Sequence, residues 1–211
     1  MDGGDIRGAV HTNMRHDSAV KHVTGRAIYI DDMPVPQNCQ ETALVLSPYA
    51  YARIVSIDIS QAVGMPGVSA VVSAKDIEGK NDIAPVFSDE PLLAEGTADY
   101  AGMPVAAVAA DTYDQALAAA RLIKVEYEEL EPVLSIEEAW EKGQFTYTPP
   151  KIVFGDAEAT IEKSPRTISG EVRCGGQDHF YLESHIALVV PGEDRDMTVY
   201  SSTQHPTEVQ H

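Results

Sequence analysis

The glycine and polar residues between positions 174 and 204 are those whose types and spacing could do chemistry. Paired glycines let the backbone approach a ligand closely, because they carry no side chain. Amide, carboxylate and imidazole groups add hydrogen-bonding capacity that a purely structural hairpin does not need. The residues concerned are Gly175, Gly176, Gln177, Asp178, His179 and Gln204. Their pattern predicts a segment that positions a ligand.

Metal ligation by side chains is not indicated in this stretch. His179 and His185 are joined by no carboxylate or cysteine at a ligand spacing, which favours a structural or hydrogen-bonded role. The only two cysteines, Cys39 and Cys174, lie far apart and outside any Cys-x-x-Cys pattern. We expect free thiols, and neither a disulfide framework nor a zinc or iron–sulfur site. For Gln204, an ordinary turn residue remains the alternative reading.

Three strands and a short helix are expected to carry this segment. Alternating or compact apolar runs predict strands over 167–173, 185–190 and 197–201. His205–Glu208 is typical of a helix start, with Pro206 at the first helical position. Since the chain ends three residues later without a helix stop signal, we expect the second domain to be cut short and the chain to belong to a longer polypeptide.

The part of the chain before this segment predicts a mixed domain. A strand over 105–109, a helix over 112–123 with a capping box of Thr112 and Gln115, and a strand over 123–127 indicate an α/β unit. A second helix is expected over 134–140, a third over 156–162, and a long surface loop over 79–96. The predicted organisation is a flexible arm (1–18), a first domain (19–143), a linker (144–154) and a second domain (155–211), in an α+β fold.

Composition limits the partners. The net charge of −18 and the pI near 4.6 argue against nucleic acid or an anionic membrane, because both would repel this surface. No apolar run is long enough for a membrane span, and the first residues lack a signal-peptide pattern, so we expect a cytoplasmic protein. A small molecule or another protein is the expected partner.

Seven strings of residues, in order along the chain, resemble one family. HDSAVKHVTGRAIYIDDMP, SPYAYARI, DEPLLAEG, YAGMPVAAVAA and KVEYEELEPVLSIEEA, which begin at His16, Ser47, Asp89, Tyr100 and Lys124, look like an α/β hammerhead domain. GGQDHFYLES and YSSTQHPTEVQ, which begin at Gly175 and Tyr200, look like the start of a molybdopterin-binding domain. The chain thus resembles the molybdenum-binding subunit of the xanthine dehydrogenase and aldehyde oxidase family, the molybdenum hydroxylases.

The resemblance implies a function and its cofactors. It implies hydroxylation of purines, hypoxanthine and xanthine to urate, with water as the oxygen source at a molybdenum–molybdopterin centre. Electrons would pass through iron–sulfur clusters and FAD, on a partner subunit or domain, to NAD, within a homo-oligomer of the heteromeric parent. The open alternatives are aldehyde oxidase or another heterocycle hydroxylase of the family, and a non-catalytic scaffold domain that holds a partner by its acidic surface.

The resemblance also implies site residues. Gln204 matches the family's glutamine beside the metal, which hydrogen-bonds a molybdenum ligand without binding the metal. Gly175, Gly176 and Gln177 are expected near the core of the cofactor domain, without an assigned contact. The family's catalytic glutamate lies farther along its chains, so we expect no catalytic residue and no direct metal ligand here, and no activity of this chain alone.

Overall fold

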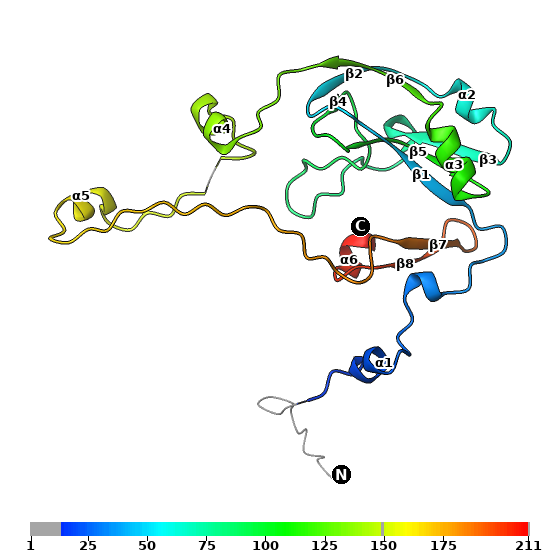
Figure 1. Cartoon of the computed structure of the whole chain (residues 1–211), viewed down its shortest axis with the longest axis horizontal. Coiled ribbons are helices and arrows are strands. Elements are labelled where there is room, and N and C mark those ends of the chain that lie inside the picture. The colour runs from blue at the N-terminus through cyan, green and yellow to red at the C-terminus, as the bar shows by residue number, and fades with distance from the viewer. Residues whose placement is uncertain (1–13, 149, 211) are drawn as a thin grey trace, which may run out of the picture. The chain divides into compact units, whose positions relative to one another are not determined.

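The computed structural model describes residues 14–148 and 150–210. These form two compact units (Figure 1): one contains the residues up to Gln37 together with those from His179, and the other contains Asn38–Asp178. Most of the predicted arm, residues 1–13, lies outside the described residues, as does position 149 of the predicted linker. The compact units divide the chain differently from the predicted domain bounds, which stay a prediction.

The larger unit, 38–178, contains two antiparallel three-stranded sheets. The first sheet has the order β1 (Glu41–Leu46), β5 (Pro104–Ala110), β3 (Val68–Ser73). The second has the order β4 (Thr97–Ala98), β2 (Ala52–Asp58), β6 (Lys124–Glu129). The predicted strand–helix–strand order is confirmed, with β5 and β6 on either side of a helix. The two strands enter different sheets, because antiparallel pairing takes each of them to a different partner.

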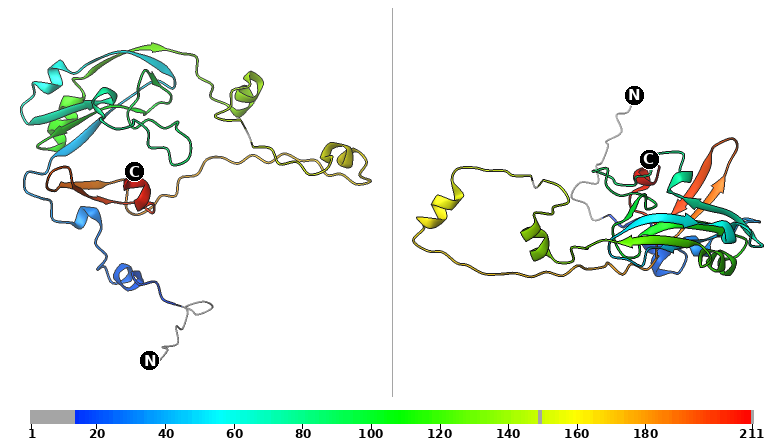
Figure 2. Two further views of the ribbon diagram at one scale, coloured as in Figure 1. Left: turned by 180° about the vertical axis from the view of Figure 1, so that it is seen from behind. Right: turned by 90° about the horizontal axis from the view of Figure 1, so that it is seen from above.

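Helix α3 (Tyr113–Ala120) covers the first sheet by packing against β1 and β5, and both views of Figure 2 keep it, in green, beside that sheet. The predicted cap is confirmed, because the Thr112 hydroxyl accepts a hydrogen bond from the Gln115 backbone N–H at 3.3 Å. Ala116, Ala119 and Val108 are fully buried between helix and sheet. Small side chains on the helix allow this close packing.

The long loop predicted over 79–96 is confirmed, since the structure has no helix or strand there. Its end contributes to a cluster of buried residues in which Ala94 lies with Met103 and Val105, and Leu93 is buried as well. The Ala94 backbone N–H donates a hydrogen bond to the Pro104 carbonyl at 2.7 Å. The loop therefore contributes to the core instead of only lying on the surface.

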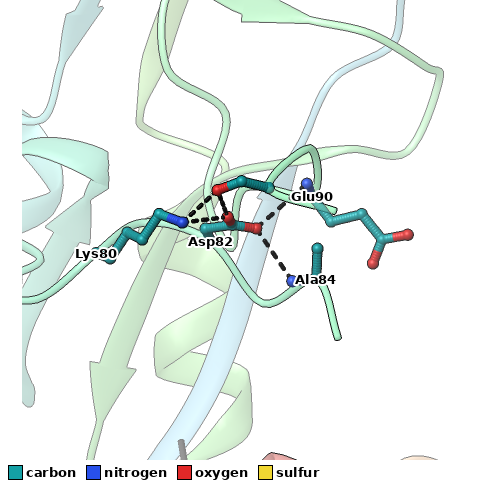
Figure 3. A network of polar contacts seen from close by, with 5 residues as sticks. Lys80, Asp82, Ala84 and Glu90 are labelled. Atoms are coloured by element: carbon teal, nitrogen blue, oxygen red, sulfur yellow. Dashed lines mark hydrogen bonds and ion pairs between the residues drawn. The ribbon is translucent and has the colours of Figure 1, made fainter. Parts of the chain in front are cut away.

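The carboxylate of Asp82 organises this loop (Figure 3). It accepts hydrogen bonds from the Ser88 hydroxyl and from the Ala84 backbone N–H, the latter at 3.1 Å, and pairs with the Lys80 ammonium at 2.9 Å. The Glu90 backbone N–H donates to the same carboxylate at 3.4 Å. The Ser88 hydroxyl, followed by the Lys80 ammonium, holds the pKa of Asp82 well below its usual range.

The remaining elements of this unit are short. They are α2 (Ser60–Val63), a 3-10 turn (Ala74–Asp76), α4 (Ile136–Lys142) and α5 (Ala157–Glu162). The predicted helices over 134–140 and 156–162 are confirmed, with side-chain caps from Ser135 and Asp156. The predicted strand over 167–173 is wrong: this stretch is irregular, because no strand of the described residues pairs with it.

The smaller unit joins two distant parts of the chain. Its first part contains α1 (Ala19–Val23) and a 3-10 turn (Ile30–Asp32); its second contains β7 (Ala187–Pro191), β8 (Met197–Ser201) and α6 (Pro206–Gln210). The strands predicted over 185–190 and 197–201 and the predicted helix start at Pro206 are thereby confirmed. Nowhere in the described chain is a helix long and apolar enough to cross a membrane.

Candidate functional site

A β-hairpin positions the predicted glutamine. Strands β7 and β8 pair antiparallel from Ala187 opposite Ser201 to Pro191 opposite Met197. Their turn is closed by the Gly192 backbone N–H, which donates to the carbonyl of residue 196 at 2.7 Å. Strand β8 then runs into the bend 202–205 and α6, shown from orange to red in Figure 1. The hairpin therefore fixes where this bend begins.

The bend is held by hydrogen bonds of its serine and threonine residues. The Ser202 backbone N–H donates to the Ile186 carbonyl at 3.2 Å, and the Ser202 hydroxyl donates to the Ser184 carbonyl at 2.7 Å. On the other side of Gln204, the Thr203 hydroxyl accepts from the His205 backbone N–H at 3.0 Å. Serine and threonine favour such turns because their hydroxyl groups substitute for backbone partners.

Gln204 itself is exposed on this bend. Within the described part of the chain its side-chain amide makes no hydrogen bond. The amide can therefore donate to an acceptor outside the chain without breaking a hydrogen bond to any described residue. A neutral amide that can donate fits the predicted role beside a molybdenum ligand, and the assignment of Gln204 to that role remains a prediction.

The other predicted site residues have no comparable support. Gly175, Gly176 and Gln177 are exposed and irregular, and in the described structure a Cβ added to either glycine would meet no atom within 4 Å. The described residues therefore form no cradle around the glycine pair. These three residues belong to the larger unit, whereas Gln204 belongs to the smaller one.

The histidine and cysteine predictions can be compared directly with the structure. The His185 ring hydrogen-bonds the Tyr181 hydroxyl and packs edge-on against its ring, which confirms a hydrogen-bonded role for His185. Cys39 and Cys174 are free thiols, as predicted. Among the described residues, no three His, Cys, Asp or Glu side chains are grouped as metal ligands.

One long-range contact of the smaller unit had no sequence signal. The Ile30 backbone N–H donates to the Glu183 carboxylate at 2.9 Å, and both residues are half-buried. Their separation of 153 positions leaves no local pattern that could indicate the contact. Ser202 was also missed, although a serine directly after a predicted strand could have indicated a turn.

Comparison with known families defines the class of protein. A profile described as "Aldehyde oxidase and xanthine dehydrogenase, a/b hammerhead domain" matches residues 24–131, and that of the molybdopterin cofactor-binding domain matches residues 140–211. The predicted fold, a hammerhead domain followed by the start of a molybdopterin-binding domain, is confirmed. The fold and its cofactor domain are those of the molybdenum hydroxylases, which bind molybdenum through molybdopterin. The chain belongs to the aldehyde oxidase and xanthine dehydrogenase family.

Individual relatives agree with this family but do not separate its branches. The xanthine dehydrogenase of Calliphora vicina is 44% identical over 198 residues, covering 92% of this chain and 15% of that protein. Aldehyde oxidase 1 of Oryctolagus cuniculus is also 44% identical, over 197 residues, covering 92% of this chain and 14% of that protein. The chain therefore spans about one seventh of the length of these relatives.

Two solved structures share the fold. Quinoline 2-oxidoreductase from Pseudomonas putida 86 has a TM-score of 0.76 at 29% identity, covering 93% of this chain and 27% of that chain. The aldehyde oxidoreductase from Desulfovibrio gigas has a TM-score of 0.73 at 29% identity, covering 89% and 23%. One is named for aldehydes and the other for quinoline, so the fold alone does not identify a substrate.

Proposed function

We propose that the chain contributes a hammerhead domain and the start of a molybdopterin-binding domain to a xanthine dehydrogenase. In the reaction of such an enzyme, a purine C–H bond is replaced by C–OH with the oxygen from water. The two electrons released reduce NAD to NADH, with release of one proton. The exposed amide of Gln204, in a chain of this family, is the observation that carries the proposal. The bound molybdenum–molybdopterin group supplies the redox chemistry.

In this proposal Gln204 orients a molybdenum ligand. Its Nε2 group donates a hydrogen bond, and the amide stays neutral at all relevant pH values, so it does not compete for the metal as a carboxylate would. Gly175, Gly176 and Gln177 are proposed to lie near the cofactor domain's core, with no contact assigned. No residue of this chain is proposed to transfer the proton.

The same proposal includes the partners. Iron–sulfur clusters and FAD are carried by a partner subunit or domain, and the assembly is a homo-oligomer of the heteromeric enzyme in the cytoplasm. The chain alone is expected to show no purine oxidation. The net charge of −18 supports a contact with a more basic partner surface, because opposite charges speed association.

Aldehyde oxidation is the second candidate, because an aldehyde oxidase matches the chain at the same 44% identity as a xanthine dehydrogenase. The two functions differ in substrate and not in the role of Gln204. Comparing hypoxanthine with an aromatic aldehyde as substrates of the loaded enzyme therefore chooses between them.

The test compares three forms of the molybdenum-loaded enzyme that contains this chain: wild type, Gln204→Ala and Gln210→Ala. Gln210 is the matched control, since it is an exposed glutamine six positions later on α6. Urate formation and NADH formation are measured together with molybdenum content. We expect Gln204→Ala to lower kcat by about 10- to 100-fold at unchanged molybdenum content, as is typical for outer partners of metal ligands.

The control variant should retain wild-type turnover. Wild-type turnover of Gln204→Ala would remove Gln204 from the site. Faster oxidation of the aldehyde than of hypoxanthine by the wild-type enzyme would favour the second candidate. No turnover of either substrate by a molybdenum-loaded wild-type enzyme would contradict both.

A further inference from the structure

We propose that Ser202 is a positioning residue that holds Gln204 in its working place, a role that rests on the proposed function of Gln204. Ser202 is half-buried and lies directly after β8, two residues before Gln204. It touches neither substrate nor cofactor in this proposal and acts only through the backbone that leads to Gln204.

The Ser202 hydroxyl connects β8 to the segment that precedes β7. It donates its single proton to the Ser184 carbonyl at 2.7 Å and accepts from the Ile186 backbone N–H at 3.2 Å. The Ile186 carbonyl, 3.4 Å from the hydroxyl, already accepts from the Ser202 backbone N–H at 3.2 Å. One hydroxyl therefore satisfies two backbone groups that the hairpin ladder does not reach.

These bonds continue the hairpin past its last strand pair. The β7–β8 ladder begins at Ala187 opposite Ser201, so the Ser202–Ile186 bonds add one more fixed pair next to the bend. The following residue, Thr203, donates its backbone N–H to the Ser201 carbonyl at 3.0 Å and binds the His205 N–H through its hydroxyl. Gln204 thus lies between two anchored residues.

Fixing the backbone matters because hydrogen bonding to a metal ligand depends on position within about 0.5 Å. An exposed amide that makes no hydrogen bond to the described residues depends on its backbone for that precision. Without the Ser202 hydroxyl, the Ile186 N–H and the Ser184 carbonyl lose a partner, and the strand end can fray. Gln204 would then sample positions from which it cannot donate to the ligand.

The experiment is a double-mutant cycle in the molybdenum-loaded enzyme, with Ser202→Ala, Gln204→Ala and the double variant. We expect Ser202→Ala to lower kcat about 10-fold, with KM and molybdenum content unchanged. The double variant should be no slower than Gln204→Ala, because Ser202 acts only through Gln204. Ser202→Thr keeps the hydroxyl and should restore turnover to within about twofold of wild type.

Ser201→Ala is the matched control, since the neighbouring Ser201 hydroxyl makes no hydrogen bond within the described residues. Hydrogen exchange gives a second readout: the Ile186 amide should exchange about 10-fold faster in Ser202→Ala than in wild type or Ser201→Ala. Restored turnover in Ser202→Thr and faster exchange of the Ile186 amide in Ser202→Ala would not follow if the Ser202 side chain only filled space.

The outcomes separate the two proposals. If Gln204→Ala turns over slowly but Ser202→Ala turns over at the wild-type rate, the positioning role is overturned and the proposed function stays intact. The same holds if the losses in kcat of the two single variants multiply in the double variant. Wild-type turnover of Gln204→Ala would overturn both, whatever Ser202→Ala does. Unchanged exchange of the Ile186 amide in Ser202→Ala would also overturn the positioning role.

Discussion

Replacing Gly67 by alanine tests how the larger unit fixes the start of β3. Gly67 has a φ of +83°, a conformation that side chains disfavour, and its carbonyl accepts from the Asp111 backbone N–H at 2.9 Å. A Cβ at this position would lie 2.5 Å from Nε2 and 2.7 Å from Cδ of Gln115. The new methyl group therefore meets both a backbone cost and a steric one.

The two costs can be given magnitudes. Left-handed backbone at an alanine costs about 1–2 kcal/mol. The Gln115 side chain is flexible and can move aside, but it then loses its hydrogen bond from the Thr112 hydroxyl, 3.0 Å long, at about 0.5–1.5 kcal/mol. Gly67→Ala should thus lower the free energy of unfolding by about 1.5–3.5 kcal/mol.

Urea denaturation of the whole chain, followed by circular dichroism, measures this loss. In a Gln115→Ala background, Gly67→Ala should cost only about 1–2 kcal/mol, because the steric partner is absent. Gly102→Ala is the matched control: φ is +92°, and no atom lies within 4 Å of an added Cβ in the described structure, so it should also cost about 1–2 kcal/mol. An equal cost of Gly67→Ala in both backgrounds would refute the steric part, and no cost in either would refute the backbone part.

Two further predictions concern single carboxylates. The pKa of Asp82 is lower in the folded chain than in the unfolded chain, so its carboxylate stabilises loop 79–96. Protection of this loop from hydrogen exchange should be complete above the unfolded pKa near 3.9 and should decrease as the pH falls toward the folded pKa. Asp82→Asn should lose this protection at neutral pH, and the control Asp89→Asn should keep it. A protection factor that stays constant from neutral pH down to pH 2 would contradict this prediction. Glu183→Ala should speed exchange of the Ile30 amide about 10-fold, whereas Glu183→Gln keeps an acceptor oxygen and most of the protection; equal exchange in both variants would exclude the contact.

Local sequence patterns predicted the elements that depend on neighbouring residues. Thr112 and Gln115 lie three positions apart and make the cap of α3 that this spacing predicts. The strand over 197–201 was predicted with its observed bounds, because its residues alternate and a turn precedes it.

Elements that depend on distant partners were not predictable in the same way. The stretch 167–173 has the composition of a strand, but a strand forms only where a neighbour accepts its hydrogen bonds, and the described structure provides none. Likewise, the sequence shows strands on both sides of α3 but not that they enter different sheets.

In the candidate site, too, the residue in a local motif could be predicted, whereas contacts between distant residues could not. Gln204 was identified through a family motif, and in the structure it lies exposed on a bend. The contacts of Ser202 and Glu183 were missed because they join residues 16 to 153 positions apart. Spacing along the chain carries no information about such pairs.

The most direct test of the central claim is an experimental structure of the molybdenum-loaded enzyme that contains this chain. The distance to measure joins Gln204 Nε2 to the nearest non-protein ligand of molybdenum. The account predicts a hydrogen bond of about 2.7–3.2 Å with the amide donating. A Gln204 amide more than about 3.5 Å from every molybdenum ligand, with no bridging water, would contradict it.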